Sequence, residues 1–179
     1  MKRLESQLNK IKNSFEKSVD EGLKKTTEVA YKRVIDNASY NHIENHLDSI
    51  HYEYDSNKRM GRVWSDDPVI IFNEFGTGIR GTQDEWANKF GYKVNASGKG
   101  ETGWYYPTTE EDPNPYKHYY NGQLYGFTHG LPSRHMFYDA YLDTKKQVGN
   151  IVTIELSKNV GGDKEWLHKK YLKMSYILI

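Results

Sequence analysis

The side chains best suited to chemistry in this sequence are a pair of histidines. His42 and His46 lie four residues apart and would share one face of a helix, which is a weak metal-binding spacing. The zinc-peptidase pattern H-E-x-x-H needs a glutamate directly after the first histidine, where this chain has Ile43. The four-residue spacing still leaves the hypothesis of a metal-dependent nuclease that uses His42, His46 and a nearby carboxylate. The plainer interpretation is hydrogen-bonding surface histidines, and we expect no catalytic residue, no cofactor and no metal site.

Aromatic side chains offer a second candidate site. The chain has 15 tyrosines, and a tyrosine covers a large area while keeping a polar tip, which suits surfaces that stay soluble until they assemble. Five rings would form a stacking platform for a glycan or a single-stranded nucleic acid if they were exposed. The same rings would equally serve as the core of a sheet. They are Trp104, Tyr105, Tyr106, Tyr119 and Tyr120.

Composition limits the classes of function. A chain of 179 residues suits one domain with a hydrophobic core, and the lack of cysteine excludes disulfides and thiolate metal sites. Basic and acidic residues number 25 and 24, so we expect no overall attraction to nucleic acid. The longest interior apolar run, residues 69–72, is far too short to span a membrane, and the charged start of the chain lacks an apolar signal core. We therefore expect a soluble protein without a membrane partner.

Residues 1–38 are predicted to form one long helix. Apolar residues recur in steps of three or four from Leu4 to Leu23, and a continuous helix would be roughly 55 Å long. That is too long to bury its stripe against so small a domain. The helix either breaks near Gly22, docks its first half on another subunit, or leaves that half solvated. Its many lysines and arginines suit an acidic partner or DNA in a channel, or else form a solvated face with pairs such as Glu21–Lys25 and Glu28–Lys32.

The rest of the chain predicts an α+β fold: the long N-terminal helix, an antiparallel β-sheet, and helices packed on one face. Three early strands are expected at 47–54, 60–64 and 69–75, and later ones around 104–106, 116–120 and 123–128, with an Asn-Gly turn at 121–122. Residues 83–90 predict a short helix. We expect a single domain over 1–160, made of the helix at 1–38, a sheet with long loops at 47–128, and a helical part at 133–160. Residues 151–156 fit either a strand or a helix, with helix favoured, and 161–179 form an amphipathic tail.

Two motifs stand out. Residues 73–78, N-E-F-G-T-G, end an apolar segment with glycines that permit a sharp turn, and they lack the spacing of a phosphate-binding loop. Residues 126–140, G-F-T-H-G-L-P-S-R-H-M-F-Y-D-A, lead from a strand into a helix. Interpreted as local structure, the first motif is a turn and the second motif docks a helix on the sheet.

The order of these motifs resembles the tail-completion, or head–tail joining, proteins of long-tailed double-stranded-DNA phages, typified by gene product ten of a lambdoid phage. That family begins with a basic amphipathic helix, continues with a strand carrying a serine–hydrophobe pair, here Ser49-Ile50, then an E-F-G-T turn and a G-x-P-x-R-x-F segment. The chain departs from the family at His135-Met136, in the long loop 79–103, and in residues 161–179. The resemblance assigns the assembly motif to Glu74, Phe75, Gly76, Thr77, Gly78, Gly130, Pro132, Arg134 and Phe137.

The resemblance implies a structural role and no catalysis. The expected protein is a virion component of a tailed phage or prophage that forms a ring and joins the head to the tail. Its partners would be copies of itself and neighbouring neck, connector or tail-terminator proteins, with a contact to DNA passing through the channel. It would lie in the bacterial cytoplasm during assembly and then at the head–tail interface. The polar loops at 79–103 and 108–115 would become ordered on meeting the next ring.

Overall fold

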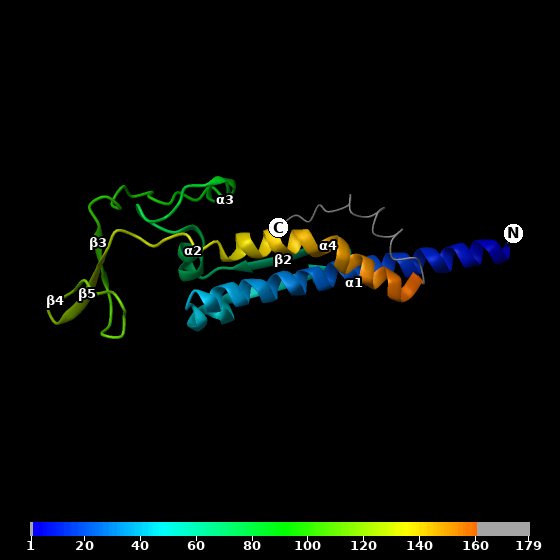
Figure 1. Ribbon diagram of the computed structural model, residues 1–179, viewed down its shortest axis with the longest axis horizontal. Helices are drawn as coiled ribbons and strands as arrows, with labels where there is room; N and C mark the ends of the chain where they lie inside the picture. Colours follow the sequence, from blue (N-terminus) through cyan, green and yellow to red (C-terminus); the bar gives the residue numbers. More distant parts are fainter. Residues whose placement is uncertain (1, 161–179) are drawn as a thin grey trace. The chain divides into compact units, whose positions relative to one another are not determined.

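The computed structural model describes residues 2–160 and confirms an α+β fold with a long N-terminal helix, antiparallel sheets and further helices (Figure 1). The predicted tail at 161–179 lies outside the described residues. Where one domain was expected over 1–160, the chain forms two compact units. The first comprises Met1–Ser65 and Asp139–Ile179, and the second comprises Asp66–Tyr138.

Helix α1, Lys2–Tyr40, dominates the first unit and confirms the predicted long helix. It continues through Gly22, so the alternative of a break there is wrong. Gly22 faces helix α4, Met136–Val160, where a Cβ on Gly22 would lie 2.9 Å from the Cα of Val152. Ser18 and Thr26, one turn away on either side, are also buried. Small residues thus let two helices approach closely, and that contact outweighs the roughly 1 kcal/mol by which glycine disfavours a helix.

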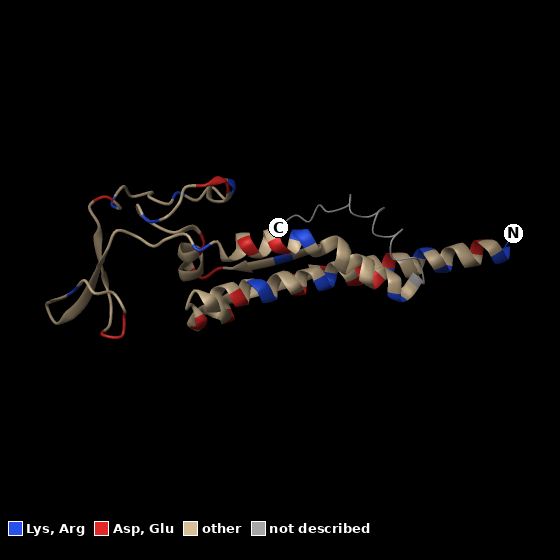
Figure 2. Ribbon diagram, in the orientation of Figure 1, with Lys and Arg blue, Asp and Glu red and all other residues tan. Residues whose placement is uncertain are grey.

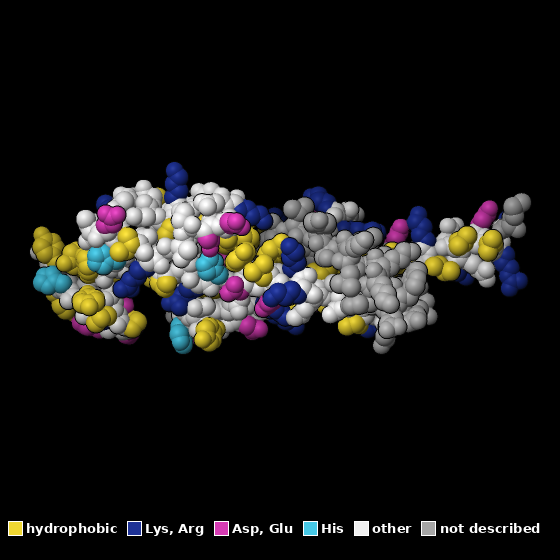
Figure 3. All heavy atoms as spheres, turned by 45° about the horizontal axis from the view of Figure 1, so that its top comes forward, with side chains coloured by type: hydrophobic (Ala, Val, Ile, Leu, Met, Phe, Trp, Pro, Cys, Tyr) yellow, Lys and Arg dark blue, Asp and Glu magenta, His cyan; other side chains and the backbone are white. Residues whose placement is uncertain are grey.

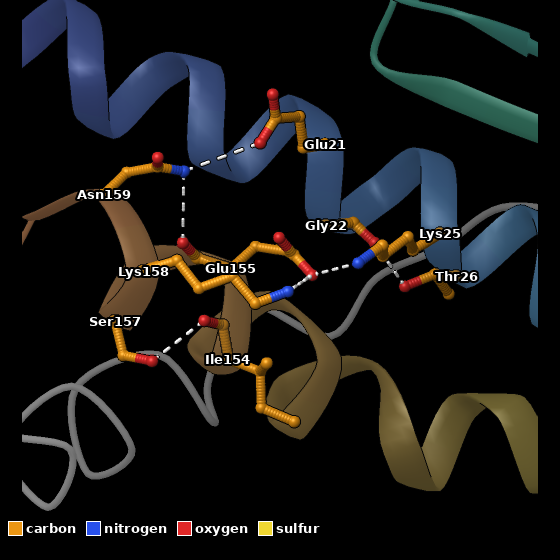
Figure 4. A network of polar contacts seen from close by, with 9 residues as sticks. All are labelled: Glu21, Gly22, Lys25, Thr26, Ile154, Glu155, Ser157, Lys158 and Asn159. Atoms are coloured by element: carbon orange, nitrogen blue, oxygen red, sulfur yellow. Dashed lines mark hydrogen bonds and ion pairs between the residues drawn. The ribbon is translucent and has the colours of Figure 1, made fainter.

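Helix α4 runs antiparallel to α1. Going along α1 toward its N-terminus, Arg33 pairs with Asp143 at 3.2 Å, and Lys25 pairs with Glu155 at 2.5 Å. Figure 4 shows that Lys158 also reaches the buried Glu155, at 2.8 Å. Hydrogen bonds from Lys158 and then Lys25 hold the pKa of Glu155 below its usual range. The expected Glu21–Lys25 pair is replaced here, since Lys25 turns toward α4 instead.

The close approach of α1 to α4 gives a testable prediction. Replacing Gly22 by Leu favours the helix intrinsically but drives a side chain into Val152, and we expect a net loss of about 2 kcal/mol in the free energy of unfolding. Lys24→Leu, at an exposed position of the same helix, should change it by less than about 0.5 kcal/mol. Urea unfolding followed by circular dichroism measures both. Equal effects would show that the approach at Gly22 is not tight.

An antiparallel hairpin packs on α1 in the first unit. Strands β1, Ile50–Asp55, and β2, Met60–Ser65, pair as the sequence predicts, after the 3₁₀ helix η1, Glu44–Ser49. The Tyr54 hydroxyl donates a 2.6 Å hydrogen bond to Asp20 of α1. A Cβ on Gly61 would lie 1.8 Å from the Thr27 hydroxyl, so the hairpin meets the helix closely there. The buried apolar residues of this unit are Val34, Ala38, Ile43, Ile50, Ala140, Val148 and Leu156.

The second unit holds helices α2, Pro68–Phe75, and α3, Glu85–Lys89, and a three-stranded antiparallel sheet. The strands are β3, Trp104–Pro107, β4, Lys117–Tyr120, and β5, Gln123–Thr128, in the order β3-β5-β4. The single predicted sheet is thus two separate antiparallel sheets. Buried apolar residues here are Ile70, Trp86, Ala87, Val94, Leu124 and Met136.

The strand predicted at residues 69–75 is wrong, because this segment is helix α2. Asp67 accepts a hydrogen bond from the Val69 N–H at 2.7 Å, and Pro68 occupies the first turn, where its missing N–H costs nothing. Both are helix-start signals. A short apolar run is compatible with a strand or a buried helix, so these neighbours decide the outcome.

Helix α4 starts later than the predicted 133 and continues without interruption to Val160. His135 has a φ of 51°, in the left-handed region, so the helix begins only after it. Residues 151–156 lie within α4, which confirms the helix preferred there. Within residues 2–160, every helix is too short or too polar to cross a membrane.

Candidate functional site

The two motifs singled out in the sequence meet in the second unit, around the carboxylate of Glu74. Glu74 lies in the last turn of α2 and is buried. Its Oε2 accepts the Phe137 N–H at 2.8 Å, and its Oε1 accepts the Tyr138 N–H at 3.0 Å. Its Oε1 also accepts the Trp86 indole N–H at 2.8 Å. Glu74 therefore caps the first turn of α4 from a distant segment, in the position where a local capping side chain usually stands.

Main-chain hydrogen bonds join the same two segments. The Arg134 N–H donates to the Asn73 carbonyl at 2.8 Å, and the Thr77 N–H donates to the Leu131 carbonyl at 2.9 Å. The Thr77 hydroxyl accepts the Leu131 N–H at 3.0 Å. Pro132 lies within the second segment, between these contacts. We call residues 73–78 and 130–138 together the interlock.

Glycines make the interlock possible. Gly130 has a φ of 123°, and a Cβ there would lie 1.8 Å from the Thr77 carbonyl oxygen. Gly78 has a φ of 61°, and its Cβ would lie 2.1 Å from the His129 carbonyl oxygen. Neither position has room for a side chain, and both backbones favour glycine. The glycines at these two positions thus allow the two backbone segments of the interlock to cross closely.

Aromatic rings cover the interlock. Phe75 stacks on Tyr92 with ring centroids 4.8 Å apart, and Trp86 lies 4.9 Å from Tyr138 and 4.7 Å from Phe90. The sequence predicts the short helix at 83–90 that carries Trp86, but it gives no sign that Trp86 is a partner of Glu74. The two residues are twelve positions apart on separate helices, and no local signal connects them.

The structure places all nine predicted motif residues in the interlock. Glu74 and Phe137 share a hydrogen bond, Phe75 packs in the aromatic cover, and Gly76 ends α2 with a φ of 73°. Among the described contacts, the interlock brings no nucleophile beside a base. What the arrangement does chemically is hold the start of a helix.

Burial raises the pKa of Glu74, and the N–H donors of Phe137, Tyr138 and Trp86 offset the shift only in part. Because its pKa is raised, Glu74 loses its proton at a higher pH in the folded chain than in the unfolded chain. Its contribution to stability is therefore complete below the unfolded pKa and declines as pH rises through the folded pKa. Relative to Glu74→Gln, the wild-type protein should lose stability as pH rises from about 4.5. Urea titrations of both proteins from pH 4 to 7 measure the difference. A wild-type advantage that grows with pH would contradict the raised pKa.

The histidine pair is not brought onto one helix. His42 lies in the turn after α1 with a φ of 59°, and His46 lies in η1. The nearest acidic contact of His42 is Glu44, at 3.9 Å, and its side chain is 92% exposed. Across residues 2–160, no group of three or more histidine, aspartate or glutamate side chains is placed to hold a metal ion.

The five candidate aromatic residues lie on both faces of the sheet. Strand register puts Tyr105 and Tyr120 on the same face as His118 and Tyr125, and these four line an open groove of about 330 Å³. Trp104, Tyr106 and Tyr119 point to the other face. Tyr105 and Tyr120 are 63% and 64% exposed, and Figure 3 shows hydrophobic side chains and histidines gathered on the surface of this sheet. We call the surface of Tyr105, His118, Tyr120 and Tyr125 the aromatic face.

Comparisons with protein-family models, with curated proteins and with solved structures found no match.

Proposed function

We propose that this protein is a structural virion component of a tailed phage or prophage that joins the head to the tail by assembling with copies of itself and with neighbouring neck proteins. The observation that carries the proposal is the aromatic face. Two tyrosines there expose nearly two thirds of their surface on a sheet of only three strands. Large exposed rings grouped on one face mark a surface that a partner covers.

The edges of this sheet support the same proposal. Strands β3 and β4 each pair with β5, so their outer edges carry main-chain groups that pair with no described strand. An open edge beside exposed rings is a ready template for a strand or loop from a neighbour. A contact between two different surfaces of the same chain repeats from copy to copy and builds a ring when the rotation between neighbours closes. The head–tail role itself comes from the resemblance in motif order.

Among the proposed partners, DNA in the channel is the one that the charges of the chain support least. Figure 2 shows basic and acidic residues interspersed along α1. Two of the lysines pair with glutamates on the next turn, Lys12 with Glu16 and Lys17 with Glu21. A surface of mixed sign attracts phosphates only slightly. We therefore assign assembly to protein surfaces and expect DNA to pass without a tight contact.

Deleting the gene tests the proposed function. In the phage or prophage that encodes this chain, we expect DNA-filled heads and finished tails that stay separate when lysates are viewed by electron microscopy. Supplying the protein from a plasmid should restore joined particles. Joined, infectious particles in the deletion strain would refute the role.

The groove on the aromatic face favours a second candidate, a module that stacks a ligand on its rings. Loop 108–115 next to the sheet carries Glu110, Glu111 and Asp112, so a neutral glycan fits better than a nucleic acid. Titrating the protein with neutral oligosaccharides while following tyrosine resonances by NMR tests this candidate. Unmoved Tyr105 and Tyr120 resonances would remove it.

A further inference from the structure

An apolar stripe is left uncovered at the N-terminal end of α1. Leu4, Leu8 and Ile11 are 63%, 57% and 57% exposed, and Figure 3 shows hydrophobic side chains at the surface there. They follow one another in steps of four and three, so they lie on one side of the helix. We call these three residues the N-terminal stripe.

The N-terminal stripe lies on the same side of α1 that α4 covers farther along the helix. The same steps lead from Ile11 to Phe15, Ser18 and Gly22, and Ser18 and Gly22 are buried. The Ser14 hydroxyl donates a 3.1 Å hydrogen bond to the carbonyl of Asn159, one residue before the end of α4. Because α4 runs antiparallel to α1, it covers this side as far as Ser14. The stripe begins where α4 ends.

The chain that follows α4 is therefore the nearest candidate to cover the stripe. From Ser14 to Leu4 is about 15 Å along the helix, and residues 161–179 are long enough to span that distance even in a helical conformation. In this segment Leu167, Tyr171, Met174 and Leu178 follow one another in steps of four, three and four. That is the spacing of Leu4, Leu8, Ile11 and Phe15, which an antiparallel partner needs.

Effective concentration favours this occupant over a second copy of the chain. Residues 163–179 follow α4 in the same chain after only two glycines, and a segment tethered this closely meets a neighbouring site at an effective concentration in the millimolar range. A second copy at about 1 μM is roughly a thousandfold more dilute. The N-terminal end of α1 and residues 163–179 both carry an excess of lysines, and the repulsion between these charges opposes docking. Attraction must then come from the apolar side chains, and docking should strengthen as salt screens the repulsion.

We propose that the N-terminal stripe of α1 is the docking site of residues 163–179 of the same chain. This inference is independent of the proposed function, because it concerns the first unit and not the aromatic face. In the proposed arrangement, the C-terminal segment continues the antiparallel pairing of α4 with α1 beyond the end of α4. The segment then shields three large apolar side chains from water before any partner arrives.

Limited trypsin digestion of the full chain tests the docking. Lys169, Lys170 and Lys173 are cleavage sites inside the segment, and docking should protect them. Leu8→Glu places a charge in the stripe and should speed cleavage at these lysines about tenfold. Ser6→Glu adds the same charge on the opposite side of the helix and should leave the rate unchanged. Equal rates in the two variants would overturn the proposal.

Disulfide trapping identifies the occupant, since the chain has no cysteine of its own. Leu8→Cys is combined in turn with cysteine at 167, 171, 174 or 178 and oxidised at about 1 μM, where contacts within a chain dominate. We expect a cross-linked monomer with at least one of these pairs and none when Ser6→Cys replaces Leu8→Cys. Cross-linked dimers, which indicate a second copy, would overturn the proposal, as would the absence of any link specific to position 8.

Discussion

Replacing Gly130 by alanine should destabilise the second unit by about 3–5 kcal/mol. The added Cβ would lie 1.8 Å from the Thr77 carbonyl oxygen, which is backbone and cannot rotate away, and the φ of 123° is itself strained for alanine. The interlock would have to open, and the start of α4 would lose its position. Urea unfolding followed by tryptophan fluorescence measures the loss, because Trp86 and Trp104 both lie in this unit.

Gly98→Ala is the matched control for that change. Gly98 also has a positive φ, of 66°, but a Cβ there would meet nothing within 4 Å. Its replacement should cost only the backbone strain, about 1 kcal/mol. Similar losses at the two positions would mean that the close crossing of Gly130 and Thr77 is not what requires glycine.

Replacing Glu74 by alanine should cost about 3–5 kcal/mol in the free energy of unfolding. The change removes the acceptor of the Phe137 and Tyr138 N–H groups and of the Trp86 indole N–H, and it leaves a cavity beside Trp86. Each buried donor without an acceptor costs about 1–3 kcal/mol, and water entering the cavity recovers part of that. The fluorescence emission of Trp86 should also shift as its hydrogen bond is lost.

Glu101→Ala serves as the control, because Glu101 is an exposed glutamate of the same unit. We expect a change within about 0.5 kcal/mol. A Glu74→Ala protein as stable as Glu101→Ala would show that the carboxylate does not hold the start of α4.

Elements with a long, regular pattern could be predicted from the sequence. The heptad-like spacing from Leu4 onward defines α1, and the Asn121-Gly122 pair defines the β4–β5 hairpin. Local signals were sufficient there because each element is specified by its own residues. At 69–75 the apolar run fits two structures, and the capping hydrogen bond of Asp67 determines the outcome.

The interlock shows what the sequence could and could not reveal. Its glycines are recognisable as turn residues, and the motifs around Glu74 and Gly130 stood out by composition. Their meeting could not be predicted, because Glu74 caps a helix that starts more than sixty residues later. Nothing near Glu74 in sequence indicates a buried carboxylate. Contacts of this range depend on the path of the whole second unit.

The division of the sheets has a similar cause. Alternating aromatic residues predict strands but not which strands pair, and the helix at 68–75 removes the strand expected between the two hairpins. The edges of the β3-β5-β4 sheet then pair with no described strand, and Tyr105 and Tyr120 of the aromatic face stay 63% and 64% exposed. That open face is the feature on which the proposed assembly depends.

The most direct test of the assembly role is complementation of the deletion strain with a protein altered only on the aromatic face. Tyr105→Asp combined with Tyr120→Asp changes two exposed rings, and Tyr40→Asp, at a site 85% exposed in the first unit, is the control. Circular dichroism should first show that both proteins are folded. We predict that the double variant yields about a hundredfold fewer joined particles than the wild type and that the control joins normally. Normal joining by the folded double variant would contradict the claim that neighbouring subunits cover this face.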